Sequence, residues 1–243
     1  MNYKMTIAYD GSRFNGWQAQ KENDNTIQSL LEKAISDMLG EKAEINGSGR
    51  TDAGVHAKGQ VANFKTKANI DKELFLRDIN EKLPSSVAVK SVEEAEERFH
   101  ARLNAKGKTY EYTIWKAAYN NVFSKRFAFE CRGLDTVKMR EAAALLIGTH
   151  DFLGFSSLKK SKKSTVRTIT AIEIKEDNET IKISYTGNGF LYNMVRIMTG
   201  TLIETGEGKR DKHSIADVLD KKDRSLAGFT APAQGLCLMD VFY

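Results

Sequence analysis

A glycine-rich segment at residues 47–57 holds the side chains of this sequence that are best suited to chemistry. It reads Gly-Ser-Gly-Arg-Thr-Asp-Ala-Gly-Val-His-Ala. Its glycines permit positive φ angles and close approach of a ligand, and Arg50 can offer a planar fork of donors to a phosphate or carboxylate. Asp52 can serve as an acceptor or a nucleophile. The residue types alone favour a simpler interpretation, in which Asp52 caps a turn or a helix on the surface.

A predicted helix over residues 190–205 supplies a second candidate. Its apolar stripe consists of Leu191, Met194, Val195, Met198 and Leu202. A different face carries Tyr192, Asn193, Arg196, Thr199 and Gly200, and Gly200 is small enough for close approach of a neighbouring segment. Because Arg196 lies among apolar residues, its guanidinium must find hydrogen-bond and charge partners or suffer a severe desolvation penalty.

Two environments for Arg196 fit this pattern equally well. The side chain can extend to solvent, or it can pair with a carboxylate on a facing loop, for which Asp52 is the candidate. In a pair, the positive charge would favour the ionised form of Asp52, and a shielded, ionised carboxylate is a competent nucleophile. Such a group could attack a sugar C1′ or an electron-poor carbon of a base, and the sequence leaves both routes open.

Two tyrosines alternate on the predicted strand from Lys108 to Trp115. Tyr110 and Tyr112 share one face of that strand. Tyrosine is common in strands, so packing within the sheet is the favoured interpretation. The alternative is an aromatic surface on which an unstacked RNA base lies.

Hydrophobic periodicity predicts the elements that position these residues. The first half has the order β-α-β-β-α-β, with the elements at 3–9, 27–39, 43–48, 58–65, 71–83 and from 87 onwards. The second half is predicted to repeat this order, with its main elements at 108–115, 135–146, 166–176, 179–186, 190–205 and 236–243. The pattern predicts an α+β protein of two ferredoxin-like halves with a mainly antiparallel sheet, divided into residues 1–103 and 104–243.

Composition narrows the functional classes. The chain has 243 residues and a formal net charge of +5, which is compatible with a polyanionic partner. Its two cysteines and four histidines show no zinc-ligand spacing, so no metal site is expected. Separate cysteines also favour reduced thiols in a cytoplasmic protein, and no transmembrane segment is predicted. The basic loop from Leu158 to Ser164 could contact phosphates or simply be solvated.

Five segments together resemble the tRNA pseudouridine synthase A family, in the order in which that family carries them. The string GRTDAGVHA around Asp52 is the most specific of them. The segments are 9–20, 49–57, 105–112, 187–196 and 231–236. The resemblance implies that Asp52 is the catalytic carboxylate, that Tyr110 stacks on the target base and that Arg196 holds the carboxylate. It also implies that Arg50 helps to position or displace the nucleotide.

The same resemblance implies a reaction and a set of partners. Members of this family convert uridines at positions 38–40 of the tRNA anticodon arm to pseudouridine, as homodimers without a cofactor. The chain contains no nucleotide-cofactor motif, which agrees with an isomerisation. Three alternatives stay open: an RNA-binding protein without activity, a nuclease or N-glycosidase, and a synthase with a different RNA target.

Overall fold

The computed structural model describes residues 1–20, 25–158 and 163–243, and the chain divides into two units. The first unit comprises residues 1–106 together with 237–243, and the second comprises 107–236. The last strand therefore groups with the first unit, whereas the sequence-based division at 103/104 kept it with the second half. The reason is that this strand pairs with a strand of the first unit, a long-range contact that periodicity cannot reveal.

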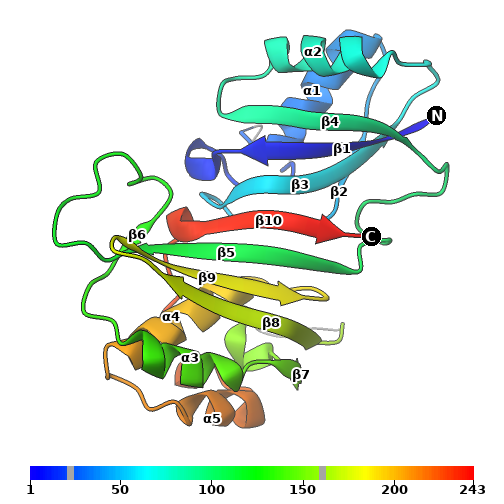
Figure 1. The fold of residues 1–243 in the computed structure, drawn as a ribbon. Helices are drawn as coiled ribbons and strands as arrows, with labels where there is room; N and C mark the ends of the chain where they lie inside the picture. The colour runs from blue at the N-terminus through cyan, green and yellow to red at the C-terminus, as the bar shows by residue number, and fades with distance from the viewer. Residues whose placement is uncertain (21–24, 159–162) are drawn as a thin grey trace. The chain divides into compact units, whose positions relative to one another are not determined.

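The described residues of the first unit form five strands and two α-helices (Figure 1). They are β1 (Asn2–Tyr9), α1 (Ile27–Leu39), β2 (Ile45–Gly47), β3 (His56–Lys65), α2 (Lys72–Lys82), β4 (Val87–Ala95) and β10 (Leu236–Phe242), with a short 3₁₀ turn, η1 (Gly11–Arg13), after β1. The order from β1 to β4 is β-α-β-β-α-β, which confirms the prediction for this half.

The helix ends of the first unit lie within one residue of the predicted positions. The Thr26 hydroxyl accepts a hydrogen bond from the Ser29 N–H and begins α1, and Gly40 ends it with a φ of 67°. A φ in this range favours glycine, because a side chain there would be strained. Asp71 caps α2 by accepting from the N–H groups of Glu73 and Leu74. Each boundary therefore follows from a local capping preference.

Strand β3 has two neighbours along one of its edges. On the other edge it pairs antiparallel with β1, which in turn pairs antiparallel with β4. Along the shared edge, β2 lies antiparallel to Ala62–Phe64, and β10 lies parallel to His56–Ala57. The end of β3 next to the glycine-rich segment is thus held from both sides.

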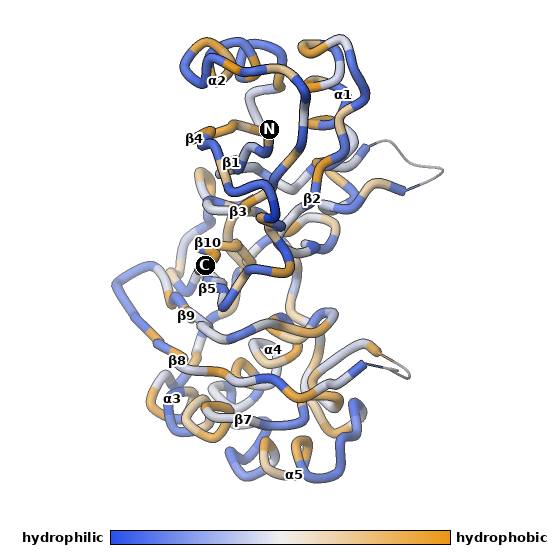
Figure 2. The backbone as a smooth tube through the Cα atoms, turned by 90° about the vertical axis from the view of Figure 1, so that its right-hand side faces the viewer, coloured by the Kyte–Doolittle hydropathy of each residue, from blue (hydrophilic) through white to orange (hydrophobic). Residues whose placement is uncertain are grey.

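An aromatic and aliphatic core joins this sheet to its helices. Tyr3 stacks on Phe64, which stacks on Phe75 of α2, with ring centroids 5.7 Å apart in each pair. Met5 and Ile7 are fully buried beside them. Hydrophobic and hydrophilic segments alternate along α2 (Figure 2), as expected for a helix that covers one face of a sheet.

The second unit has a sheet in the order β5-β9-β8-β7, with every pair antiparallel. Its strands are β5 (Gly107–Trp115), β7 (Gly148–Asp151), β8 (Val166–Glu176) and β9 (Thr180–Gly187), and β6 (Phe129–Glu130) lies parallel to β5. Its helices are α3 (Thr136–Ala144), α4 (Met194–Gly206) and α5 (Ser214–Lys221), with the 3₁₀ turns η2 (Leu153–Phe155), η3 (Arg224–Leu226) and η4 (Ala233–Gly235). None of the described helices is long and apolar enough to cross a membrane.

The predicted α+β class with mainly antiparallel pairing is confirmed in each unit. Two details of the second unit differ from prediction. The short strands β6 and β7 were not predicted, because two and four residues carry too little periodicity. Helix α4 begins at Met194 and not at residue 190, because Asn193 has a φ of 59°, which a continuing right-handed helix does not allow.

Candidate functional site

Backbone hydrogen bonds hold the loop that carries Asp52 in place. The Thr51 carbonyl accepts a hydrogen bond from the Trp17 N–H at 3.1 Å, and the Asp52 carbonyl accepts one from the Val55 N–H at 3.1 Å. Gly54 has a φ of 79°, which closes the turn where a side chain would be strained. Thr51 and Val55 are buried, while Asp52 is half-buried. The loop therefore fixes the position of Asp52 and leaves its carboxylate partly accessible.

Two aromatic side chains, Tyr9 and Trp17, pack beneath this loop in the core of the first unit. The Tyr9 hydroxyl and the Thr51 hydroxyl are 2.8 Å apart, and burial raises the pKa of Tyr9 far above its ordinary value. The Trp17 ring lies beside Tyr9, with centroids 6.2 Å apart. A Cβ at Gly47 would meet the Trp17 indole nitrogen at 2.4 Å, so only glycine leaves room for this ring. Trp17 thus packs into the core of its own unit.

His56 lies at the end of the loop and contacts the segment after β1. The Gly11 N–H donates to His56 Nδ1 at 3.1 Å. The side chain is buried, and Asp10 Oδ1 lies 3.3 Å from the same nitrogen. His56 therefore acts here as a structural residue of the β1–η1 junction.

Arg50 lies on the exposed side of the same loop. Its Nε donates to the Gln18 side-chain oxygen at 3.0 Å. Gln18 in turn donates from its amide nitrogen to Gln28 at 2.7 Å. Because this contact uses the Nε edge, it orients the planar guanidinium on the surface of the first unit. Arg50 and Asp52 thus belong to one loop of that unit.

Tyr110 and Tyr112 lie on β5 in the second unit, and their environments differ. Tyr110 is 8% exposed and meets Phe190 edge-on, with ring centroids 5.3 Å apart. Tyr112 is fully buried and donates its hydroxyl hydrogen to the Pro232 carbonyl at 2.8 Å. Burial raises the pKa of Tyr112 far above its ordinary value, although the nearby charge of Arg196 acts in the opposite direction. Tyr112 is therefore a neutral core residue and not part of an aromatic surface.

Arg196 lies in the first turn of α4 and contacts backbone and amide oxygens. Its Nε donates to the Ala231 carbonyl at 2.7 Å, and its Nη1 donates to the Asn193 side-chain oxygen at 2.9 Å. The Asn193 amide nitrogen donates to the Ser157 hydroxyl at 2.9 Å. These contacts fix a half-buried guanidinium within the second unit, so the alternative of a side chain that only extends to solvent does not hold.

Three contacts of the site were not predicted from the sequence. Gln18, Asn193 and Ala231 contact the two arginines, and all three fall within segments on which the family resemblance rests. The sequence gives no separate indication of these contacts, because the partner of a side-chain amide or a backbone carbonyl is known only from the structure. Of the basic loop 158–164, residues 159–162 lie outside the described residues.

Comparison with known proteins gives consistent matches. A family model described as tRNA pseudouridine synthase matches residues 5–104 and 142–243. A tRNA pseudouridine synthase A 2 of Bacillus cereus is 45% identical over 241 residues, which cover 99% of this chain and 98% of the relative. A tRNA pseudouridine synthase A of Acetivibrio thermocellus is 42% identical over 243 residues, covering 100% of this chain and 99% of the relative.

A likeness to a solved structure is weaker. The crystal structure of a Cbf5-Nop10-Gar1 complex aligns over 97% of this chain and 48% of that chain, with 14% identity and a TM-score of 0.36. These values are too low to add to the assignment. The sequence matches, which cover 99% and 100% of this chain in the two relatives and include the Asp52 loop and the Arg196 helix, are sufficient without it. The chain belongs to the tRNA pseudouridine synthase A family.

Proposed function

We propose that this protein isomerises uridine to pseudouridine at positions 38–40 of the tRNA anticodon arm, with Asp52 as the catalytic carboxylate. Tyr110 stacks on the target base, Arg196 holds the carboxylate, and Arg50 positions or displaces the nucleotide. The protein acts as a homodimer and needs no cofactor. The relatives named above are called tRNA pseudouridine synthases, and their match to this chain over nearly its full length supports the proposal.

The observation that carries the proposal is the construction of the Asp52 loop. The Thr51 carbonyl accepts a hydrogen bond from the Trp17 N–H and the Asp52 carbonyl accepts one from the Val55 N–H, so the backbone at Asp52 is fixed while its side chain stays half-buried. A fixed backbone limits where the carboxylate can lie, which favours nucleophilic attack. A loop that served only as a surface turn would not require the support of two buried aromatic residues.

The reaction itself explains why so few residues are needed. The N1–C1′ bond of uridine breaks and a C5–C1′ bond forms. A general base removes the proton from C5 and N1 gains a proton, so there is no net consumption of electrons, protons or water. Asp52 can attack either C1′ or C6 to begin this exchange. A stem uridine must first leave the helix, as in other enzymes that act on a base. Arg50 lies on the exposed side of the Asp52 loop, where it can contact the displaced strand or its phosphates.

The proposal is tested by mapping pseudouridine in bulk tRNA from a strain that lacks the gene. We expect positions 38–40 to be unmodified and to be restored by the wild-type gene but not by an Asp52→Asn variant. Modification that is lost at other positions, or in another RNA, would replace the proposed substrate. Unchanged pseudouridine with altered tRNA binding would favour a binding protein. Strand breaks or free uracil in a reaction with purified protein would favour a nuclease or an N-glycosidase.

A further inference from the structure

Arg196 shares one face of α4 with two residues that extend toward the far end of that helix. Gly200 and Glu204 follow it at intervals of four residues, which places all three on the same side. Of the thirteen residues of α4, Arg196 and Glu204 are the two that are not buried. Packing alone does not explain why two charged residues lie on one face of a helix that is otherwise buried.

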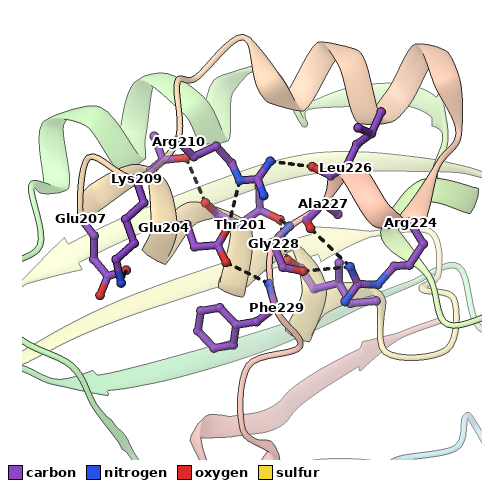
Figure 3. Close-up of polar contacts among 12 residues, drawn as sticks. Thr201, Glu204, Glu207, Lys209, Arg210, Arg224, Leu226, Ala227, Gly228 and Phe229 are labelled. Atoms are coloured by element: carbon purple, nitrogen blue, oxygen red, sulfur yellow. Dashed lines mark hydrogen bonds and ion pairs between the residues drawn. The ribbon is translucent and has the colours of Figure 1, made fainter.

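A segment of the chain, residues 227–231, covers this face, and we call it the strap (Figure 3). It runs antiparallel to α4. The Phe229 N–H donates to Glu204 at 3.3 Å, the Gly228 N–H donates to the Thr201 hydroxyl at 2.9 Å, and the Ala231 N–H donates to the Arg196 carbonyl at 3.1 Å. The strap therefore contacts successive turns of the helix and ends at Arg196.

Two glycines allow the strap to lie directly on the helix backbone. A Cβ at Gly200 would lie 1.9 Å from the Phe229 carbonyl oxygen, and a Cβ at Gly228 would lie 2.7 Å from the Thr201 Cα. Neither neighbour is a flexible side chain, so a methyl group at either position would move the strap. The close approach predicted for Gly200 is thus confirmed, and the strap is the segment that approaches.

Three charged residues fix the other end of the strap (Figure 3). Glu204 pairs with Arg210 at 2.9 Å, and Arg210 also donates to the Leu226 carbonyl at 2.6 Å. Arg224 donates to the Gly228 carbonyl at 2.9 Å and to the Thr230 hydroxyl at 3.1 Å. Hydrogen bonds from charged donors to several oxygens are stronger and more directional than neutral ones. They prevent the strap from sliding along α4.

The register of the strap decides where the guanidinium of Arg196 points, because its Nε donates to the carbonyl of Ala231. We infer that the strap positions Arg196 for the reaction, and that Glu204 and Arg224 are positioning residues that act through it. This inference rests on the proposed function, which assigns Arg196 to the carboxylate. It adds that the rate of isomerisation depends on contacts of the strap two helical turns from Arg196.

The test compares two glycines of the same helix. Gly200→Ala pushes the strap, whereas Gly206→Ala makes the same change where the new methyl group meets the flexible Met139 side chain. With C5-tritiated tRNA under single-turnover conditions, we expect Gly200→Ala to lower the rate by about tenfold to a hundredfold, the scale of a 1 Å misplacement. Its Kd for tRNA should stay within about twofold of wild type. Gly206→Ala should keep the wild-type rate.

Equal rates for the two alanine variants would overturn the inference, as would a loss in Gly200→Ala that lies entirely in tRNA affinity. If Gly200→Ala does not fold, Glu204→Gln provides the same test, because it keeps the side-chain shape while it removes the ion pair with Arg210. A folded Glu204→Gln protein with the wild-type rate would also overturn it.

A combination with Arg196→Lys separates positioning from general destabilisation. Lysine cannot reproduce the Nε contact with Ala231, so Gly200→Ala should lower the rate less in that background than in wild type. An undiminished loss would mean that the strap does not act through Arg196. If Arg196→Lys alone has the wild-type rate, the role of Arg196 in the proposed function fails. If Arg196→Lys is slow and Gly200→Ala is not, only the strap inference fails.

Discussion

Asp52 is the residue whose chemistry and structural role are most cleanly separable. Its backbone belongs to a fixed turn, but its half-buried side chain contributes little to the core. Asp52→Asn keeps shape and hydrogen bonding while removing the charge. We therefore expect a normal thermal midpoint, normal tRNA binding in a filter assay and no detectable pseudouridine. Near-wild-type turnover of this variant would show that another group performs the attack.

Tyr110 can act through its ring and through its hydroxyl. Stacking needs only an aromatic face, whereas assisting removal of the C5 proton needs an O–H group within reach. Tyr110→Phe should therefore keep tRNA affinity but release tritium from C5 more slowly, and Tyr110→Ala should weaken both. A phenylalanine variant as fast as wild type would eliminate the proton-transfer role, and an equally fast alanine variant would eliminate both.

Individual residues differ in how far the sequence reveals their environment. The apolar neighbours of Arg196 left open whether its side chain extends to solvent or pairs with a carboxylate, and the structure shows it donating to the Ala231 and Asn193 oxygens. Tyr110 and Tyr112 looked alike in the sequence, yet the Tyr112 hydroxyl is committed to Pro232. Alternation along a strand gives the face of a side chain, but not what lies against that face.

At the scale of elements, the proposal needs Arg196 of α4 to pair with the carboxylate of the Asp52 loop. Arg196→Met keeps an unbranched apolar stem and removes the guanidinium, so the variant should fold while it leaves the carboxylate without the proposed partner. If the two side chains touch, adding Asp52→Asn to Arg196→Met should change the free energy of unfolding non-additively, by more than about 0.5 kcal/mol. Strict additivity in denaturant titrations would refute the pair.

Elements with strong local signals were predicted well, and those defined by distant contacts were not. Thr26, Gly40 and Asp71 end or begin helices through their own side chain or φ angle, so the sequence alone locates them. Helix α4 is buried almost all round, and a single apolar stripe described it too narrowly. The strap that covers its remaining face contacts the helix through backbone N–H groups. Every residue carries such a group, so the contact leaves no periodic pattern in the sequence.

For the whole molecule, the proposed isomerisation requires neither a metal nor a cofactor. We expect full turnover after exhaustive chelation, provided that the tRNA is folded beforehand, since tRNA itself depends on divalent cations. The measurement is the rate of tritium release with and without chelator, with tRNA folding checked in parallel. A loss of rate that zinc or magnesium restores, at unchanged tRNA structure, would contradict this expectation.

The pairing of β10 with β3 determines when the first unit can complete its fold during synthesis. The ribosome synthesises residues 1–106 first, but this unit lacks a strand until 237–243 have emerged, after the whole of the second unit. That strand pairs with His56 and Ala57, and the Tyr243 hydroxyl donates to the Ala101 carbonyl. A nascent chain stalled before residue 237 should therefore expose the Asp52 loop to proteases, and protection should begin only once β10 is added. The unit that holds the Asp52 loop is thus begun before the second unit and completed after it.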